Sequence, residues 1–453
     1  MASDAAPPQA GYPGGGARSA AGYPMPQQAA PPGDVASATG AAYGAPMPLA
    51  TAAAVSPAME PSVAKAARAE ESARPGPVAV AAAGVRAGEW DDNANYRDFL
   101  GYIGKAQSLG IDRLDVSSRR FVVVQDKDGA GVPSCKVTIS DPASQKTATL
   151  TTAASGRAVF FPKVAGMSGK LNASTTCLTQ SKTSVAFDTT DADGAVELKI
   201  AAARGDVSKP TIDVVFVLDT TGSMSEEIES VKSTLKTVLS RLDEGVKIRV
   251  GLVEYKDQTD DLVTKTYPLT SDIKSLSASI AKLSADGGGD TPEDVNSGLS
   301  VAVSQMQWND KATARLAFLI ADAPPHLDYA DSTSYSASAK RAAEKGIKVF
   351  TVAASGMDAV GQAVFRQIAQ LTGGTNMFVL RGGAGPQSTG GGDPTSSCGA
   401  THQNYSSGNL DQLITGKISQ EITSLKADPM RIPGLSQDES AKACKDRVLI
   451  VAR

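Results

Sequence analysis

The chain has 453 residues, enough for two or three domains, and its charge is nearly balanced, with 44 Lys and Arg against 48 Asp and Glu. This balance, with an aromatic content of only 5%, argues against a surface for nucleic acid or an anionic membrane. No run of about 18 apolar residues occurs, so no membrane span is predicted. The first residues lack the basic and apolar segments of a secretory signal, so either the protein is cytoplasmic or the signal is missing from this version of the sequence.

The first 85 residues are rich in Ala, Pro and Gly and contain few large apolar side chains. Such a segment buries too little apolar surface to offset the entropy lost on ordering, so residues 1–85 are predicted to be a disordered leader. The leader could tether the protein to a surface, or be an inert tail. Residues 86–117 are predicted to be a helical linker that packs against a neighbouring domain. Its apolar side chains near helical spacing are Trp90, Tyr96, Leu100 and Ile103.

Residues 118–205 contain six or seven short strand-like segments separated by turn sequences such as DKDGAG and DADG. This spacing predicts an antiparallel β-sandwich. The stretch QDKDGAGVPSCKVTIS followed by SGRAVFFP resembles bacterial immunoglobulin-like and carboxypeptidase-regulatory-like sandwich modules. The resemblance covers about 80 residues and implies a sandwich of that kind.

From residue 207 to residue 428, strands alternate with amphipathic helices, which predicts an α/β fold with a doubly wound, mostly parallel, Rossmann-like sheet flanked by helices. An antiparallel edge strand is expected at TKTYPLT, residues 264–270. The last 25 residues, 429–453, form a tail whose end, RVLIVAR, could add a strand to one of the two sheets.

Oxygen-bearing side chains gather where three parts of the predicted α/β fold meet. Asp219 ends a buried strand, and Thr221 and Ser223 follow it at alternate positions. Thr291 lies in the loop GGGDTPED, and Asp322 ends the central strand ARLAFLIAD. In open α/β sheets, ligands bind at the carboxyl ends of the strands, so these side chains are expected to meet there. Two carboxylates and three hydroxyls without nitrogen or sulfur suit Mg²⁺ or Mn²⁺.

The set Asp219, Thr221, Ser223, Thr291 and Asp322 resembles the metal-ion-dependent adhesion site (MIDAS) of von Willebrand factor type A (VWA) domains. The family's first motif is Asp-x-Ser-x-Ser, and Thr221 replaces its middle Ser while keeping the hydroxyl. The resemblance implies that Asp219 and Asp322 contact the ion directly or through water, and that the three hydroxyls supply further oxygens. It also implies magnesium-dependent protein binding, as in cell adhesion or assembly, in which the cation captures a carboxylate of a protein ligand.

Other functions are compatible with parts of this pattern. Thr221, Ser223 and Thr291 could be simple helix N-caps. The same site could serve an intracellular scaffold or chaperone-like subunit, or a metal-dependent hydrolase. The sequence has no GxxxxGK[ST] loop and no GxSxG setting around Ser223, so it is not expected to encode an enzyme. The leading hypothesis is an extracytoplasmic or cell-surface binding module, with a cytoplasmic location as the alternative.

Four cysteines are widely spaced, and with only two histidines they do not suggest a zinc site. They could be free buried thiols, or they could form two disulfides in an oxidising compartment. If bridges exist, the favoured pairs are Cys135 with Cys177 and Cys398 with Cys444, because each pair stays within one predicted module.

Overall fold

A computed structural model of the chain describes residues 86–179, 182–241, 246–289, 291–354, 356–379 and 406–435. The predicted leader, the strand predicted near the C-terminus, and Cys398 and Cys444 lie outside these ranges. Among the described residues, no helix has the length and apolarity that a membrane crossing requires.

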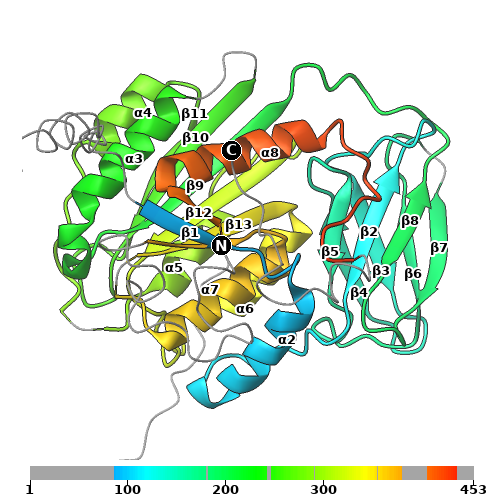
Figure 1. The fold of residues 1–453 in the computed structure, drawn as a ribbon, viewed down its shortest axis with the longest axis horizontal. Helices are drawn as coiled ribbons and strands as arrows, with labels where there is room; N and C mark the ends of the chain where they lie inside the picture. The colour runs from blue at the N-terminus through cyan, green and yellow to red at the C-terminus, as the bar shows by residue number, and fades with distance from the viewer. Residues whose placement is uncertain are drawn as a thin grey trace, which may run out of the picture. The chain divides into compact units, whose positions relative to one another are not determined.

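The main sheet has eight strands in the order β11-β10-β9-β12-β13-β14-β1-β15 (Figure 1). Its five central strands, from β10 to β14, run parallel to one another, and β11, β1 and β15 pair antiparallel. The mixed, mostly parallel sheet predicted for this region is therefore confirmed. The strands are β9 (Thr211–Asp219), β10 (Lys247–Tyr255), β11 (Thr264–Thr270), β12 (Ala314–Ala321), β13 (Ile347–Ala353), β14 (Asn376–Val379), β1 (Arg86–Trp90) and β15 (Ser406–Asn409).

Helices cover both faces of this sheet because its central strands are apolar on both sides. On β9, Val214 and Phe216 pack with α3 (Ile228–Ser240), α4 (Ile273–Ile280) and α8 (Leu410–Ser424). Val215 and Val217 belong to the opposite cluster. The helices of that cluster are α2 (Tyr96–Lys105), α5 (Val295–Ser304), α6 (Tyr335–Glu344) and α7 (Ala359–Thr372).

The segment predicted as a helical linker differs from the prediction at its start. Residues Arg86–Trp90 form strand β1, which lies between β14 and β15 in the main sheet. The predicted amphipathic helix begins later, at Tyr96. This stretch is a strand because it pairs with β14, which lies about 290 residues away in the sequence. The buried side chain of Glu89 also forms an ion pair with Lys417 of α8. The main sheet thus begins before the region of the small sheets and resumes after it.

Two small sheets occupy residues 120–199, with strand orders β5-β2-β8 and β4-β3-β6-β7. Their apolar side chains share one core, to which Val122, Ile139 and Leu171 belong. The pair β2 and β8 runs parallel, so the prediction of a purely antiparallel arrangement is wrong there. The likeness to immunoglobulin-like modules stays a prediction. The strands are β2 (Arg120–Gln125), β3 (Lys136–Ser140), β4 (Thr147–Thr151), β5 (Arg157–Phe160), β6 (Lys170–Thr175), β7 (Thr183–Asp188) and β8 (Ala195–Lys199).

The buried ion pair between Glu89 and Lys417 predicts that β1 is an integral part of the main sheet. Replacing Glu89→Gln leaves the Lys417 ammonium buried without its counter-charge, which should lower the free energy of unfolding by about 3 kcal/mol. Urea unfolding measures this change. The control is Asp128→Asn, which breaks a solvent-exposed pair with Lys127 and should change the free energy of unfolding far less than Glu89→Gln does. Equal effects of the two substitutions would contradict the buried position of β1.

Candidate metal centre

The carboxylate of Asp219 is completely buried at the carboxyl end of β9, the strand between β10 and β12. Its Oδ1 accepts hydrogen bonds from the Thr221 backbone N–H at 2.9 Å and from the Thr221 hydroxyl at 2.7 Å. Its Oδ2 accepts a long contact of 3.4 Å from the Tyr255 hydroxyl at the end of β10. The turn after β9 is therefore stabilised by hydrogen bonds to the Asp219 carboxylate.

Thr221, Ser223 and Asp322 continue the contacts that begin at Asp219. The hydroxyl oxygens of Thr221 and Ser223 lie 3.1 Å apart, and the Ser223 hydroxyl donates to Asp322 Oδ1 at 2.9 Å. Ser223 is presented by the short 3₁₀ helix η3 (Gly222–Glu226), and Asp322 follows directly after β12. Four of the five predicted site residues thus form one connected group at the carboxyl ends of neighbouring strands.

Two carboxylates in this group interact unfavourably when both are ionised. Burial, and after it the nearby negative charge of Asp322, together raise the pKa of Asp219 to about 7. The hydrogen bonds from Thr221 and Tyr255 act in the opposite direction but do not compensate. A positive charge at this position would relieve both the desolvation and the repulsion.

Thr291 is not part of the hydrogen-bonded group formed by Asp219, Thr221, Ser223 and Asp322. Its side chain is exposed, and it does not cap the following helix, which begins at Val295. The cap is Asp294, whose carboxylate accepts a hydrogen bond of 2.9 Å from the Ser297 backbone N–H. The expectation that Thr291 caps this helix is therefore wrong, because the chain turns into the helix three residues later.

Glu293 faces the group instead and was not predicted. Its side chain is 1% exposed, it contacts the Thr221 hydroxyl, and its Oε2 has no hydrogen-bond partner among the described residues. Burial, followed by the charge of Asp219, raises its pKa to about 8. Gly288 makes room for it, since a Cβ there would come within 2.7 Å of Glu293 Oε1. The sequence gives only a weak signal for Glu293, an acidic residue directly after Thr291-Pro292.

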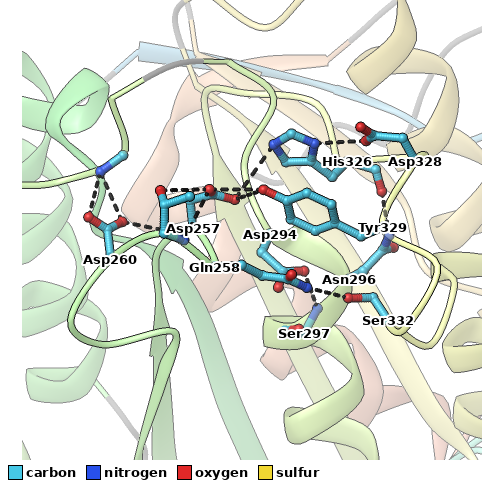
Figure 2. Close-up of polar contacts among 12 residues, drawn as sticks. Asp257, Gln258, Asp260, Asp294, Asn296, Ser297, His326, Asp328, Tyr329 and Ser332 are labelled. Carbon is cyan, nitrogen blue, oxygen red and sulfur yellow. Dashed lines mark hydrogen bonds and ion pairs between the residues drawn. The ribbon is translucent and has the colours of Figure 1, made fainter. Parts of the chain in front are cut away.

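Hydrogen bonds fix the loops around the site (Figure 2). The Tyr329 hydroxyl donates to Asp257 after β10, with oxygen distances of 2.8 and 2.9 Å, and the Tyr329 ring stacks on His326 at 3.8 Å. His326 in turn contacts Asp328 through Nδ1 at 2.8 Å. Asp260 accepts from the Gly288 N–H at 3.0 and 2.9 Å, which joins the loop after β10 to the glycine loop.

A further backbone contact joins the Glu293 segment to the loop after β12. The Glu293 N–H donates to the Pro324 carbonyl at 3.0 Å, and the His326 N–H donates back to the Glu293 carbonyl at 3.1 Å. Donor oxygens from three loops are therefore held in place by the protein itself. Carboxylates and hydroxyls are the ligands that Mg²⁺ and Mn²⁺ prefer, so the side chains of Asp219, Thr221, Ser223 and Asp322 are of a kind that fits such an ion.

Comparison with known proteins identifies the α/β region. The family model of the von Willebrand factor type A domain matches residues 213–383, so this segment is a VWA domain, generally a protein-interaction module. An ariadne-like RING finger protein of Acanthamoeba polyphaga mimivirus is 31% identical over 120 residues, which are 26% of this chain and 12% of that protein. Alpha-protein kinase vwkA of Dictyostelium discoideum is 31% identical over 119 residues, 25% of this chain and 19% of the kinase. The chain thus matches less than a fifth of either relative.

Solved structures show more distant similarity. Proximal thread matrix protein 1 from the mussel byssus aligns with 13% identity and a TM-score of 0.29 over 36% of this chain and 40% of that chain. The pilus adhesin SpaC from Lactobacillus rhamnosus GG aligns with 14% identity and a TM-score of 0.29 over 45% of this chain and 29% of that chain.

The raised pKa of Asp219 predicts how stability depends on pH when divalent cations are chelated. The folded state keeps the Asp219 proton up to about pH 7, whereas the unfolded chain loses it near the ordinary value of 3.8. The Asp219 contribution to stability is therefore present below pH 3.8 and is lost as the pH rises toward about 7. Asp219→Asn removes this loss and should stabilise the chelated protein at pH 8 by on the order of 4 kcal/mol.

Urea unfolding in the presence of a chelator at pH 5 and pH 8 measures this difference between Asp219→Asn and the wild type. The difference should be smaller at pH 5, where the wild-type carboxyl is mostly protonated in the folded state. A variant that is less stable than the wild type at pH 8 would show that Asp219 is not a buried, electrostatically unfavourable carboxylate.

Proposed function

We propose that this VWA domain binds a protein partner through Mg²⁺ or Mn²⁺ held at the carboxyl ends of β9 and β12. In this proposal the cation captures a carboxylate of the partner. The observation that carries the proposal is the connected group of Asp219, Thr221, Ser223 and Asp322, which brings two carboxylates and two hydroxyls together at the carboxyl ends of neighbouring strands.

Different residues of the chain would contribute different ligands to the cation. Asp219 and Asp322 would supply negative charge, and Thr221 and Ser223 would supply neutral oxygens whose hydrogen bonds keep the carboxylates oriented. Glu293 would contribute a third carboxylate after its side chain turns toward the ion, because no three carboxylates meet among the described residues, while its buried Oε2 has no hydrogen-bond partner there. Thr291, exposed at the rim, would act only after the glycine loop moves inward.

The proposed role is binding, without a bond made or broken. A water or a partner oxygen would complete the cation's shell, and the partner's carboxylate would replace that water. Binding at an extracytoplasmic or cell-surface location belongs to the same proposal, with residues 1–85 as the tether. An intracellular scaffold could use the same oxygen ligands, so the site does not distinguish the two locations. Cell fractionation would determine where the protein is found.

Two substitutions separate Glu293 from Thr291 as cation ligands. Glu293→Gln should weaken Mn²⁺ binding, measured by calorimetry, by about tenfold or more, because it removes a buried negative oxygen that faces the site. Thr291→Ala should leave the affinity nearly unchanged, since its side chain is exposed. Asp261→Asn is the matched control, because it removes an exposed carboxylate from the same end of the sheet. A larger loss of Mn²⁺ affinity in Thr291→Ala than in Glu293→Gln would support Thr291, as the sequence predicts, and not Glu293 as the cation ligand.

Partner capture can be tested by a pulldown from native cell extract with the full-length protein as bait. Proteins retained in Mg²⁺ should be released by a chelator and should be absent with Asp219→Ala, because that variant lacks the central carboxylate. Asp261→Asn should retain the same proteins as the wild type. Partners that persist with both the chelator and Asp219→Ala would show that binding does not pass through a cation.

A further inference from the structure

A second group of reactive side chains lies far from the candidate metal centre in sequence, in the small sheets. Cys135 directly precedes β3, and Cys177 follows β6, its neighbour in the four-stranded sheet. Both are free thiols in the structure, so the disulfide favoured from the sequence is not formed in this state. Cys135 is buried, and Cys177 is half-buried.

The register of β3 and β6 places the two cysteines opposite each other. These strands pair antiparallel, with Thr138 opposite Ser174 and Ile139 opposite Ala173. Continuing that register by three residues brings Cys135 opposite Cys177. Both cysteines point toward the core that the two small sheets share, Cys135 as a member of it and Cys177 packed against it.

The backbone hydrogen bonds of Cys135 define the type of cross-strand pair. Its N–H donates to the Thr152 hydroxyl at 2.9 Å, and its carbonyl accepts from the Thr152 N–H at 3.0 Å. Both groups therefore point toward the β4 side and away from β6. Cys135 and Cys177 thus occupy a non-hydrogen-bonded position, where opposite Cα atoms lie about 4.5 Å apart. That separation lies within the range that a disulfide spans.

Thr175 contacts both cysteines. Its hydroxyl oxygen lies 3.2 Å from Cys135 Sγ and accepts from the Cys177 N–H at 3.1 Å. The neighbouring Cys177 thiol and burial raise the pKa of Cys135, whereas the neighbouring Cys135 thiol lowers the pKa of Cys177, so Cys177, the more accessible of the two, loses its proton more readily.

We propose that Cys135 and Cys177 form a redox site that closes to a cross-strand disulfide when the protein meets a disulfide oxidant such as oxidised glutathione. The Cys177 thiolate attacks one glutathione sulfur and releases the other glutathione as a thiolate. Cys135 then loses its proton, and its sulfur attacks Cys177 and displaces the second glutathione. Two protein thiols are oxidised, and one glutathione disulfide is reduced to two thiols.

The closed bridge would join residues 135 and 177 at the end of the shared core. A covalent loop of this length restricts the unfolded chain and leaves the native register unchanged, because the pair already lies within bonding range. The oxidised protein should therefore be more stable than the reduced protein, with the same fold.

The test treats the folded, full-length protein with oxidised glutathione, blocks remaining thiols by alkylation and maps the peptides by mass spectrometry. The expected product is the Cys135 peptide linked to the Cys177 peptide without bound glutathione, with a higher melting temperature that a reductant reverses. Cys135→Ser should trap glutathione on Cys177, whereas Cys177→Ser should react slowly, because Cys135 is buried.

The peptide map of the oxidised wild-type protein tests the proposed disulfide even if a variant fails to fold. Persistent alkylation of both thiols after oxidation of the folded protein would overturn the proposal. So would a link that forms only in denaturant, a wild-type protein that keeps glutathione on Cys177, or a melting temperature that falls on oxidation. None of these outcomes depends on divalent cations, so the result is independent of the metal-binding proposal.

Discussion

The structure depends on a carboxylate that is costly to bury. Asp219 ends the central strand β9 with no exposed surface, and the charge of Asp322 lies close enough to raise its pKa. A buried carboxylate in an apolar sheet loses its hydration, and hydrogen bonds from Thr221 restore only part of that loss. The rest must be supplied by a proton or by a cation. The proposed cation binding would therefore be linked to the stability of the fold, since an ion that binds only the folded state stabilises it.

The rigidity needed to hold that carboxylate comes from elements remote from it in sequence. β9 packs on helices on both faces, so its carboxyl end cannot move without disturbing two apolar clusters. The loops add a second constraint, because Asp260 binds the Gly288 N–H and Glu293 binds the Pro324 carbonyl. The fold itself thus positions these oxygens, which would reduce the entropic cost of the proposed cation binding.

Local sequence was sufficient to predict the parts of the site that follow directly from strand ends. Asp219 and Asp322 each end an apolar strand, and Thr221 and Ser223 follow within one turn, so chain connectivity alone places them together. Glu293 was missed because its orientation is set by backbone hydrogen bonds to Pro324 and His326, about 30 residues away. In the loop between Gly289 and α5, the sequence suits a helix start at either Thr291 or Asp294. The backbone hydrogen bonds of Glu293 to the loop after β12 place the start at Asp294.

The same limitation explains the differences in the fold. β1 contains a glycine and only five residues, and its identity as a strand depends on partners at residues 376–379 and 406–409. The parallel pairing of β2 with β8 is likewise a long-range choice that alternating apolar residues cannot reveal, because both directions give the same burial pattern. Periodicity identified the elements, and non-local pairing decided how they were arranged.

Exposure divides the site into an inner and an outer part. Asp219, Thr221, Glu293 and Asp322 are buried, whereas Ser223 and Thr291 are exposed. The inner residues are surrounded by the main sheet and can respond only to something as small as a proton or an ion. Any larger partner must approach from the outer side, across the loop that carries Leu327, an apolar side chain that is 42% exposed. In the proposed function, the inner residues would set the affinity for the cation, and the outer loops would be the part of the chain that distinguishes one partner from another.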